Sequence, residues 1–516
     1  MASVVSLLAG DFDVLAKRAL HQAKLADIVE LRLDRIGHPG EARLAAFMKE
    51  CPKPVIVTVH GGEAYGTFRG SVDERCEILL AAARAGARFV DVDWTLSLEL
   101  GEVEAPCHRI VSRHQLDGTP ADLATFDEEV REVLYEGDVV KLVSHARCTE
   151  DGLRMLRHLR RARGGLIAFC SGPAGSFTRL LAPIFGSPFT YAAPSEEAGA
   201  QALEPTAPGQ LRIDELLGCA PPGGFSPETA VLAVVGSPIG HSVSPFVHGM
   251  ALKHAHLDAV YVALEPADFG RFLELADDEN FRGLSVTAPF KGDAFLAAAQ
   301  TDDRSARIRA TNTLVRDGAG WRGFNTDVGA VRETIDTIFR VHGAEPGRPV
   351  AAGASQPLIL GAGGAARAAC GALMEADARP ILAARDAAKA SALASELGLT
   401  SIAWDDIPST EWNVLVHCTP VGTEGGPTAG ESPIPADWIR PGSLVLDAVY
   451  KPIKTPLIAA AVARGCTAVP GAEWFVRQAR EQFELFTHKA PDEPLLRAAF
   501  EGALQQGEQR TQRRSR

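Results

Sequence analysis

Short apolar runs alternate with helical patterns through the first 218 residues of the chain. Most of the runs are separated by segments in which apolar residues recur at helical spacing, as in 74–85 and 149–161. Eight strand–helix units within this length predict a closed (β/α)8 barrel over residues 1–218. The expected strands are residues 4–9, 27–34, 54–60, 89–94, 108–114, 138–146, 166–172 and 189–194.

Proline and glycine then break the pattern, because residues 219–229 contain Pro-Pro-Gly-Gly and predict a linker. A new α/β pattern starts at residue 230, and a loop-rich stretch, 343–357, precedes an apolar strand at 358–361. The predicted domains are therefore 230–335 and 336–472, with helical segments at 473–505 returning to the first of them and a flexible basic tail at 506–516.

Composition narrows the class of protein. Of the 516 residues 46% are hydrophobic and 23% charged, as in ordinary soluble globular proteins, and no stretch is apolar for long enough to span a bilayer. The net charge of −13 argues against nucleic acid or an anionic membrane as a partner. Nine scattered cysteines without a C-x-x-C pair predict free thiols and no zinc site. With no basic leader before residues 4–9, we expect a bacterial cytoplasmic protein.

Lys141 lies inside the apolar run 138–144. A charged lysine is costly to bury, and a closed parallel barrel offers no edge strand at which the ammonium reaches water. The alternative is an edge strand with a solvated lysine. We favour an amine with a depressed pKa that attacks a ketone.

Other polar residues stand in the same strands. His114 ends a strand just before that of Lys141, so we favour a general acid/base over a structural histidine. Glu30, Arg32 and Asp34 alternate and share one face of their strand. A buried ion-pair network and a cradle for a polar substrate both fit that spacing.

Five motifs in order resemble type I 3-dehydroquinate dehydratase. They are Glu-x-Arg-x-Asp at 30–34, Ser-x-His at 112–114, Val-Lys at 140–141, the run 178–187 with Arg179, and Ala-Pro-Gly-Gln at 207–210. The resemblance implies that Lys141 forms a Schiff base with the substrate, His114 moves the proton, and Glu30 orients His114. It implies that the carboxylate and hydroxyls of the substrate are held by Arg32, Arg179, Thr206 and Gln210. His60 stands where this family usually has arginine, and we count it among the substrate-binding residues.

The second half also carries a set of short motifs. Each is weak alone: Ser244 before Pro245 fits a helix N-cap, Lys291 a solvated surface lysine, and Asp327 the start of a helix. Together, Ser-x-Ser-Pro at 242–245, Val-Thr-x-Pro-x-Lys at 286–291, Asn-Thr at 312–313 and Gly-x-Asn-Thr-Asp at 323–327 resemble shikimate dehydrogenase. That family's pattern implies Lys291 and Asp327 as the catalytic pair. The residues implied to bind substrate are Ser242, Ser244, Thr287, Asn312, Tyr450 and Gln478. Departures from the family are Gly249, Ser285, and Trp474 in place of methionine.

A glycine loop between a strand and a helix predicts a dinucleotide site. The strand 358–360 leads into the predicted pyrophosphate loop, Gly361, Ala362, Gly363, Gly364 and Ala365. The next strand ends at Arg385 with no acidic residue at its tip, which favours NADP over NAD, although Asp386 follows directly. Thr419, in the Thr-Pro-Val-Gly run, completes the implied cofactor residues.

The two resemblances describe consecutive reactions, so we expect a bifunctional enzyme that uses the small molecules 3-dehydroquinate, 3-dehydroshikimate and shikimate. Two alternatives stay open: a quinate/shikimate dehydrogenase with an impaired barrel, and a metabolite-binding regulator built on the same domains. The second requires lost catalytic groups, whereas Lys141, His114, Lys291 and Asp327 are all present.

Overall fold

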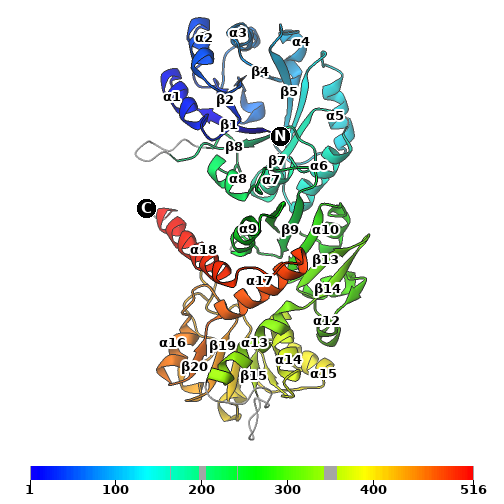
Figure 1. Cartoon of the computed structure of the whole chain (residues 1–516), viewed down its shortest axis with the longest axis vertical. Coiled ribbons are helices and arrows are strands. Elements are labelled where there is room, and N and C mark those ends of the chain that lie inside the picture. The colour runs from blue at the N-terminus through cyan, green and yellow to red at the C-terminus, as the bar shows by residue number, and fades with distance from the viewer. Residues whose placement is uncertain (1, 163, 197–204, 241, 342–356, 515–516) are drawn as a thin grey trace. The chain divides into compact units, whose positions relative to one another are not determined.

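The computed structural model describes residues 2–162, 164–196, 205–240, 242–341 and 357–514 (Figure 1). The chain divides into two compact units. The first comprises Met1–Ala230, His256–Val260 and Leu264–Asn280, and the second Val231–Ala255, Tyr261–Ala263 and Phe281–Arg516. Among the described residues, no helix is long and apolar enough to cross a membrane.

The first unit is built on a parallel eight-stranded sheet in the order β7-β6-β5-β4-β3-β2-β1-β8. Its strands are β1 (Ala2–Leu8), β2 (Ile28–Arg32), β3 (Val55–Thr58), β4 (Phe89–Asp93), β5 (His108–Gln115), β6 (Val139–His145), β7 (Leu166–Ser171) and β8 (Phe189–Ala192). The predicted barrel is confirmed, but the expectation of full closure is corrected, because the sheet ends at β7 and β8 and is only nearly closed. Lys141 nevertheless has a strand on both sides, since β6 pairs with β5 and β7.

Helices surround these strands in Figure 1. They are α1 (Phe12–Gln22), α2 (Glu41–Glu50), α3 (Val72–Arg84), α4 (Ser97–Leu100), α5 (Leu123–Arg131), α6 (Thr149–Arg161), α7 (Phe177–Leu181) and α8 (Ile213–Cys219). Local sequence fixes several starts: Asp11 caps α1, and Ser71 with Glu74 forms a capping box at α3. Buried residues of the strands form an apolar cluster: Val4, Ile28, Ile56, Ile110, Val143, Ile167, Phe169 and Tyr191.

A six-stranded mixed sheet follows, in the order β10-β9-β11-β13-β14-β12. The strands are β9 (Ala230–Val235), β10 (Ala259–Leu264), β11 (Phe281–Val286), β12 (Gln300–Thr301), β13 (Thr313–Asp317) and β14 (Gly320–Phe324). Strand β9 runs parallel to β11, whereas β13 runs antiparallel to β11 and β14. The helices of this region are α9 (Ser244–His254), α10 (Phe269–Leu275), α11 (Lys291–Ala297) and α12 (Asp303–Ile308).

The third sheet is wholly parallel, in the order β17-β16-β15-β18-β19-β20. Its strands are β15 (Leu358–Leu360), β16 (Ile381–Ala383), β17 (Thr400–Ser401), β18 (Val414–His417), β19 (Leu444–Asp447) and β20 (Thr467–Val469). Numbered from β15, this is the strand order 3-2-1-4-5-6 of a dinucleotide-binding fold, so the predicted Rossmann-type architecture is confirmed. Its helices include α14 (Gly364–Met374), α15 (Ala387–Leu397) and α16 (Pro456–Ala463).

Three long helices join these two sheets within the second unit: α13 (Thr326–Val341), α17 (Gly471–Thr487) and α18 (Glu493–Arg514). Helix α17 packs on α13, and α18 packs on α9 and α17. The backbone of α18 continues through most of the predicted tail, and residues 515–516 lie outside the described residues. Most of the loop-rich stretch 343–357 also lies outside them.

Candidate active sites

The barrel lysine is buried against a carboxylate. Lys141 on β6 is 5% exposed, and its Nζ donates a hydrogen bond of 2.7 Å to Oδ2 of Asp91 on β4. The same Nζ lies 4.0 Å from Oε1 of Glu30 and 4.3 Å from the ring centroid of Tyr191 on β8. The amine is therefore enclosed by two carboxylates and an aromatic face.

Asp91 links three polar groups. Its Oδ1 accepts a hydrogen bond of 2.6 Å from Ser112 and lies 3.3 Å from Nε2 of His60. Burial alone raises the pKa of Asp91, but Lys141 and His60 reverse this and hold the pKa below its ordinary value. Asp91 was not among the residues predicted from the sequence. The criterion that identified Lys141 applies to it as well, because it is a charged residue inside an apolar strand.

His114 faces His60 edge-on, with 5.2 Å between the ring centroids. Burial, and then the nearby His60 and Lys141, lower the pKa of His114 well below its ordinary value. Its Nδ1 is buried without a hydrogen-bond partner among the described residues. A lowered pKa favours the neutral imidazole, which is the form that a general base requires.

The alternating polar residues Glu30, Arg32 and Asp34, in and just after β2, make two separate sets of contacts. Arg32 donates hydrogen bonds of 3.2 and 2.5 Å to the two carboxylate oxygens of Asp34, as in a buried ion-pair network. Glu30 accepts a hydrogen bond of 2.8 Å from Thr58. With that bond and with Lys141 nearby, the predicted action of Glu30 on His114 stays a prediction.

Arg179, on α7, lies with its guanidinium 4.1 Å from the centroid of the Phe169 ring. Its Nε and Nη1 are buried without hydrogen-bond partners in the described part of the chain. Burial lowers the pKa of Arg179 to about 10, although Cys170 and then Glu30 raise it. A buried, largely unpaired guanidinium is suited to a carboxylate ligand.

Thr206 and Gln210 lie in the segment between β8 and α8. The Gln210 side-chain oxygen accepts a hydrogen bond of 2.9 Å from the backbone of Thr206, whose hydroxyl also contacts Ser6 on β1. The neighbouring Gly209 has φ +77°, and a Cβ there would lie 2.5 Å from the carbonyl oxygen of Gly172. The segment therefore packs closely against the loop that follows β7.

The second unit contains a cavity of about 820 Å³. Eight residues predicted from the sequence line it: Ser242, Ser244, Thr287, Lys291, Asn312, Asp327, Tyr450 and Gln478. Two predicted cofactor residues, Ala365 and Arg385, also line it. The cavity brings together residues from the mixed sheet, from helix α17 and from loops that follow strands of the parallel sheet.

The predicted catalytic pair is in contact. Lys291, the first residue of α11, donates a hydrogen bond of 2.7 Å to Oδ2 of Asp327 near the start of α13. Trp474 on α17 donates one of 2.9 Å to Oδ1 of the same carboxylate. Both oxygens of Asp327 are therefore engaged, and all three residues face the cavity.

The residues around this pair form a hydrogen-bonded wall. The amide of Asn312 exchanges two bonds with Thr326, donating to its Oγ1 at 2.9 Å and accepting from its backbone N–H at 2.8 Å. Tyr261 donates to Ser285, which donates to Gln482, at 2.7 and 2.8 Å. Ser285 was noted in the sequence only as a departure from the family, and Tyr261 and Gln482 were not predicted.

Other predicted substrate residues sit around the same cavity. The Ser242 hydroxyl accepts a bond of 3.3 Å from the backbone N–H of Ser244. Gln478 donates to the Phe475 carbonyl at 3.1 Å, and the ring of Tyr450 lies 5.1 Å from that of Phe475. Burial raises the pKa of Tyr450 to about 12, so its hydroxyl stays protonated.

The glycine loop runs from β15 into α14. Gly361 has φ +125°, and a Cβ there would approach the Cys418 carbonyl oxygen to 3.0 Å. Gly363 is the N-cap of α14 and provides no side chain to cap its first turn. A Cβ on Gly364 would lie 2.7 Å from Cδ of Lys291. The loop also includes Ala362. Because no side chain caps the first backbone N–H groups of α14, these groups fit a pyrophosphate at the helix N-terminus.

Arg385 follows β16 and lines both the large cavity and a small one of about 90 Å³ that Thr419 also lines. Asp386 is instead the N-cap of α15, where its side chain accepts a hydrogen bond of 3.2 Å from the backbone N–H of Lys389. Arg385 therefore presents a positive charge to both cavities while Asp386 lines neither, which fits the 2′-phosphate of NADP. In the described ranges, no cluster of His, Cys, Asp and Glu forms a metal site.

Two known protein families match different parts of the chain. The type I 3-dehydroquinase family matches residues 4–219, and the shikimate dehydrogenase substrate-binding domain matches residues 234–314. The bifunctional 3-dehydroquinate dehydratase/shikimate dehydrogenase of Arabidopsis thaliana, whose name calls it chloroplastic, is 31% identical over 90% of this chain and 78% of that protein. The NADP(+) shikimate dehydrogenase of Halobacterium salinarum is 39% identical over 53% of this chain and 99% of that protein.

Among solved structures, the shikimate 5-dehydrogenase of Thermus thermophilus in complex with NADP(H) and shikimate is 30% identical, with a TM-score of 0.47. The match covers 53% of this chain and all of the Thermus chain. Fold and sites define a lyase-type barrel joined to a dinucleotide-dependent reductase. The Arabidopsis comparison completes the assignment: the chain belongs to the bifunctional 3-dehydroquinate dehydratase/shikimate dehydrogenase family.

Proposed function

We propose that the chain catalyses two consecutive reactions. The first unit dehydrates 3-dehydroquinate to 3-dehydroshikimate, and the second reduces 3-dehydroshikimate to shikimate with NADPH. One observation carries the proposal: each half of the chain holds a lysine and a carboxylate 2.7 Å apart, with the groups that each reaction needs beside them.

In the barrel, the ammonium of Lys141 gives one proton to His114, and the resulting amine attacks the substrate ketone. His114 returns that proton to the former carbonyl oxygen, which leaves as water, and a protonated imine remains as the electron sink. His114 removes a proton from the adjacent carbon, and the electron pair forms a double bond as the neighbouring hydroxyl leaves. That hydroxyl departs as water with the proton from His114. Hydrolysis of the imine then frees Lys141, so the net change is the loss of one water.

The charges around Lys141 support this role. Asp91 holds the lysine in the free enzyme, and neutral His114 is the base close at hand. Arg179 is the first candidate for the substrate carboxylate, because two of its buried nitrogens have no hydrogen-bond partner among the described residues. The remaining substrate contacts are assigned to Arg32, His60, Thr206 and Gln210, with Glu30 orienting His114.

In the reductase, bound NADPH supplies the hydride. Lys291 donates a proton to the carbonyl oxygen of the substrate as that oxygen becomes an alkoxide, and Asp327 holds the lysine. The hydroxyls and carboxylate of the substrate are assigned to Ser242, Ser244, Thr287, Asn312, Tyr450 and Gln478. The open end of α14 and Arg385 fit the pyrophosphate and the 2′-phosphate of the cofactor.

The finer organisation belongs to the proposal as well. The dehydratase occupies residues 1–218, followed by a linker at 219–229. The reductase consists of a substrate domain at 230–335, which includes the helices at 473–505, and a cofactor domain at 336–472. Free thiols among the described cysteines suit a reducing compartment, and we propose the cytoplasm.

NADPH oxidation by the purified protein tests this function. Oxidation is expected with 3-dehydroshikimate and, after dehydration, with 3-dehydroquinate. Oxidation with 3-dehydroshikimate alone would contradict an active barrel and make His60 the first suspect. Faster turnover of NADP⁺ with quinate than with shikimate would move the assignment to a quinate dehydrogenase. No turnover of any of these substrates would favour the regulator.

A further inference from the structure

Trp474 contacts the catalytic carboxylate from the side opposite the lysine. Its Nε1–H donates to Oδ1 of Asp327 at 2.9 Å, while Oδ2 accepts from Lys291 at 2.7 Å. The tryptophan is 5% exposed and borders the cavity. A carboxylate held through one oxygen retains rotation about its side-chain bonds, and a second donor on the other oxygen removes that freedom.

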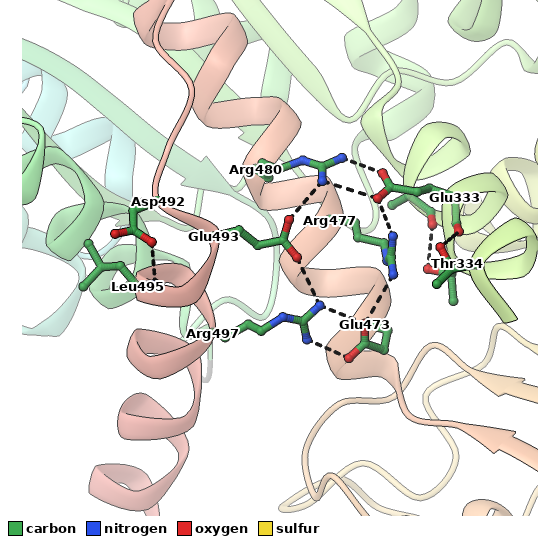
Figure 2. Close-up of polar contacts among 11 residues, drawn as sticks. Glu333, Thr334, Glu473, Arg477, Arg480, Asp492, Glu493, Leu495 and Arg497 are labelled. Atoms are coloured by element: carbon green, nitrogen blue, oxygen red, sulfur yellow. Dashed lines mark hydrogen bonds and ion pairs between the residues drawn. The ribbon is translucent and has the colours of Figure 1, made fainter. Parts of the chain in front are cut away.

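A ring of six charged residues connects the helices that carry these groups. Figure 2 shows Arg480 between Glu333 and Glu493, and Arg497 between Glu493 and Glu473. Arg477 contacts both Glu333 and Glu473 and closes the ring. Glu333 lies on α13, six residues after Asp327, and Glu473 precedes Trp474 on α17.

This ring restricts sliding of α17 along α13. Isolated surface ion pairs contribute little, but in a closed network each charge is held by two partners, and the side chains are already ordered. The pairs Arg480–Glu333 and Arg480–Glu493 measure 2.5 and 3.0 Å. The indole N–H is therefore presented to Asp327 from a helix fixed at a set position.

We propose that Trp474 is a positioning residue of the reductase: its indole N–H fixes Asp327 so that the carboxylate holds Lys291 ready for proton transfer. The inference rests on the proposed reduction. It assigns a role to a position that sequence analysis marked only as a departure from its family. Simple packing is the alternative, because the ring of Trp474 also belongs to an apolar cluster with Val328 and Ala330.

Trp474→Phe separates the two roles, because it removes the N–H and keeps an aromatic ring. We expect kcat for 3-dehydroshikimate reduction to fall about tenfold, as for loss of one hydrogen bond to a charged group, with KM for NADPH within about twofold of the wild type. Trp321→Phe is the matched control, since Trp321 is buried on β14 away from the cavity.

A double substitution tests whether the effect passes through Asp327. In an Asp327→Ala background, Trp474→Phe is expected to cost no more than about a further twofold in kcat. Glu333→Gln should lower kcat in the same direction but less, because it weakens the ring without breaking the indole contact. Wild-type kcat in Trp474→Phe, or a full additional loss in the Asp327→Ala background, would overturn the proposal.

One readout needs no substrate. The indole proton of Trp474, identified in NMR spectra by its absence from Trp474→Phe, should exchange with solvent at least about tenfold faster in Asp327→Ala than in the wild type. Unchanged exchange would overturn the hydrogen bond itself. If the wild type instead fails to reduce 3-dehydroshikimate, the proposed function fails, while the exchange rate still decides whether Trp474 holds Asp327.

Discussion

Lys141 and Lys291 make the same contact in different surroundings. Each ammonium lies 2.7 Å from an aspartate oxygen. Lys141 is enclosed in the barrel between Asp91, Glu30 and Tyr191. Lys291 borders a cavity of about 820 Å³ and lies close to the first glycine of helix α14.

The difference shows that a lysine–aspartate pair does not by itself define a reaction. Beside Lys141 stands His114, whose burial keeps it neutral and able to accept protons, so the amine can become a nucleophile. Lys291 instead borders the large cavity, beside a carboxylate held from both sides, and these surroundings suit the proposed role of its ammonium as a proton donor. The neighbours of each pair determine its chemistry.

The largest expected effect comes from exchanging each lysine for alanine. Lys141→Ala should lower dehydratase activity by at least about 10³-fold, because the covalent route disappears, and leave reduction of 3-dehydroshikimate within about twofold. Lys291→Ala should do the reverse. Separate assays with each substrate measure both activities, and loss of both activities in either variant would break the comparison.

Asp91→Asn should lower dehydratase kcat by about 10²-fold, because Lys141 and His60 lose the charge that orders them. Ser112→Ala removes only one hydrogen-bond donor to Asp91, and we expect it to lower dehydratase kcat by about threefold. Steady-state dehydration rates give both values. Equal losses in the two variants would show that the charge of Asp91 is not what matters.

Arg385→Gln should raise the KM for NADPH about tenfold and leave the KM for NADH within about twofold, because only NADPH carries a 2′-phosphate. Lys389→Gln, a substitution of the exposed partner of Asp386, serves as the control. A parallel rise for both cofactors would indicate that Arg385 supports the fold of the cofactor site and does not read the phosphate.

The smallest expected effect concerns His248, whose ring stacks on Tyr261 at 4.4 Å in the second unit. Burial lowers the pKa of His248 to about 3. Between about pH 6.5 and that value the unfolded chain binds a proton that the folded chain does not, so stability falls as pH falls. His248→Phe should therefore lose about 2–4 °C less in melting temperature between about pH 7.5 and 5 than the wild type. An equal loss of melting temperature in His248→Phe and in the wild type would contradict this prediction.

Much of the architecture could be predicted from the sequence, because the patterns that indicate strands, helices and glycine loops are local. Eight apolar strands and one glycine loop specify the barrel and the dinucleotide fold without tertiary information. Contacts between distant segments were not accessible: Asp91 meets Lys141 across 50 residues, and Trp474 meets Asp327 across 147. The sequence did show that both residues were unusual: Asp91 is a charged residue in an apolar strand, and Trp474 departs from the pattern of its family.

Incomplete closure of the barrel between β7 and β8 also lay beyond the sequence, because strand pairing at the ends of a sheet depends on registers that a local pattern does not record. The burial of Lys141 was nevertheless anticipated correctly. Its strand lies inside the sheet and is paired on both sides.

Borohydride trapping tests most directly that the two lysines perform different chemistry. The wild type is reduced with sodium borohydride in the presence of 3-dehydroquinate, and the modified residue is located by peptide mass spectrometry. A substrate-derived adduct on Lys141, with Lys291 unmodified, is the predicted result. An adduct on Lys291, or dehydration that proceeds without any trapped adduct on Lys141, would contradict the account.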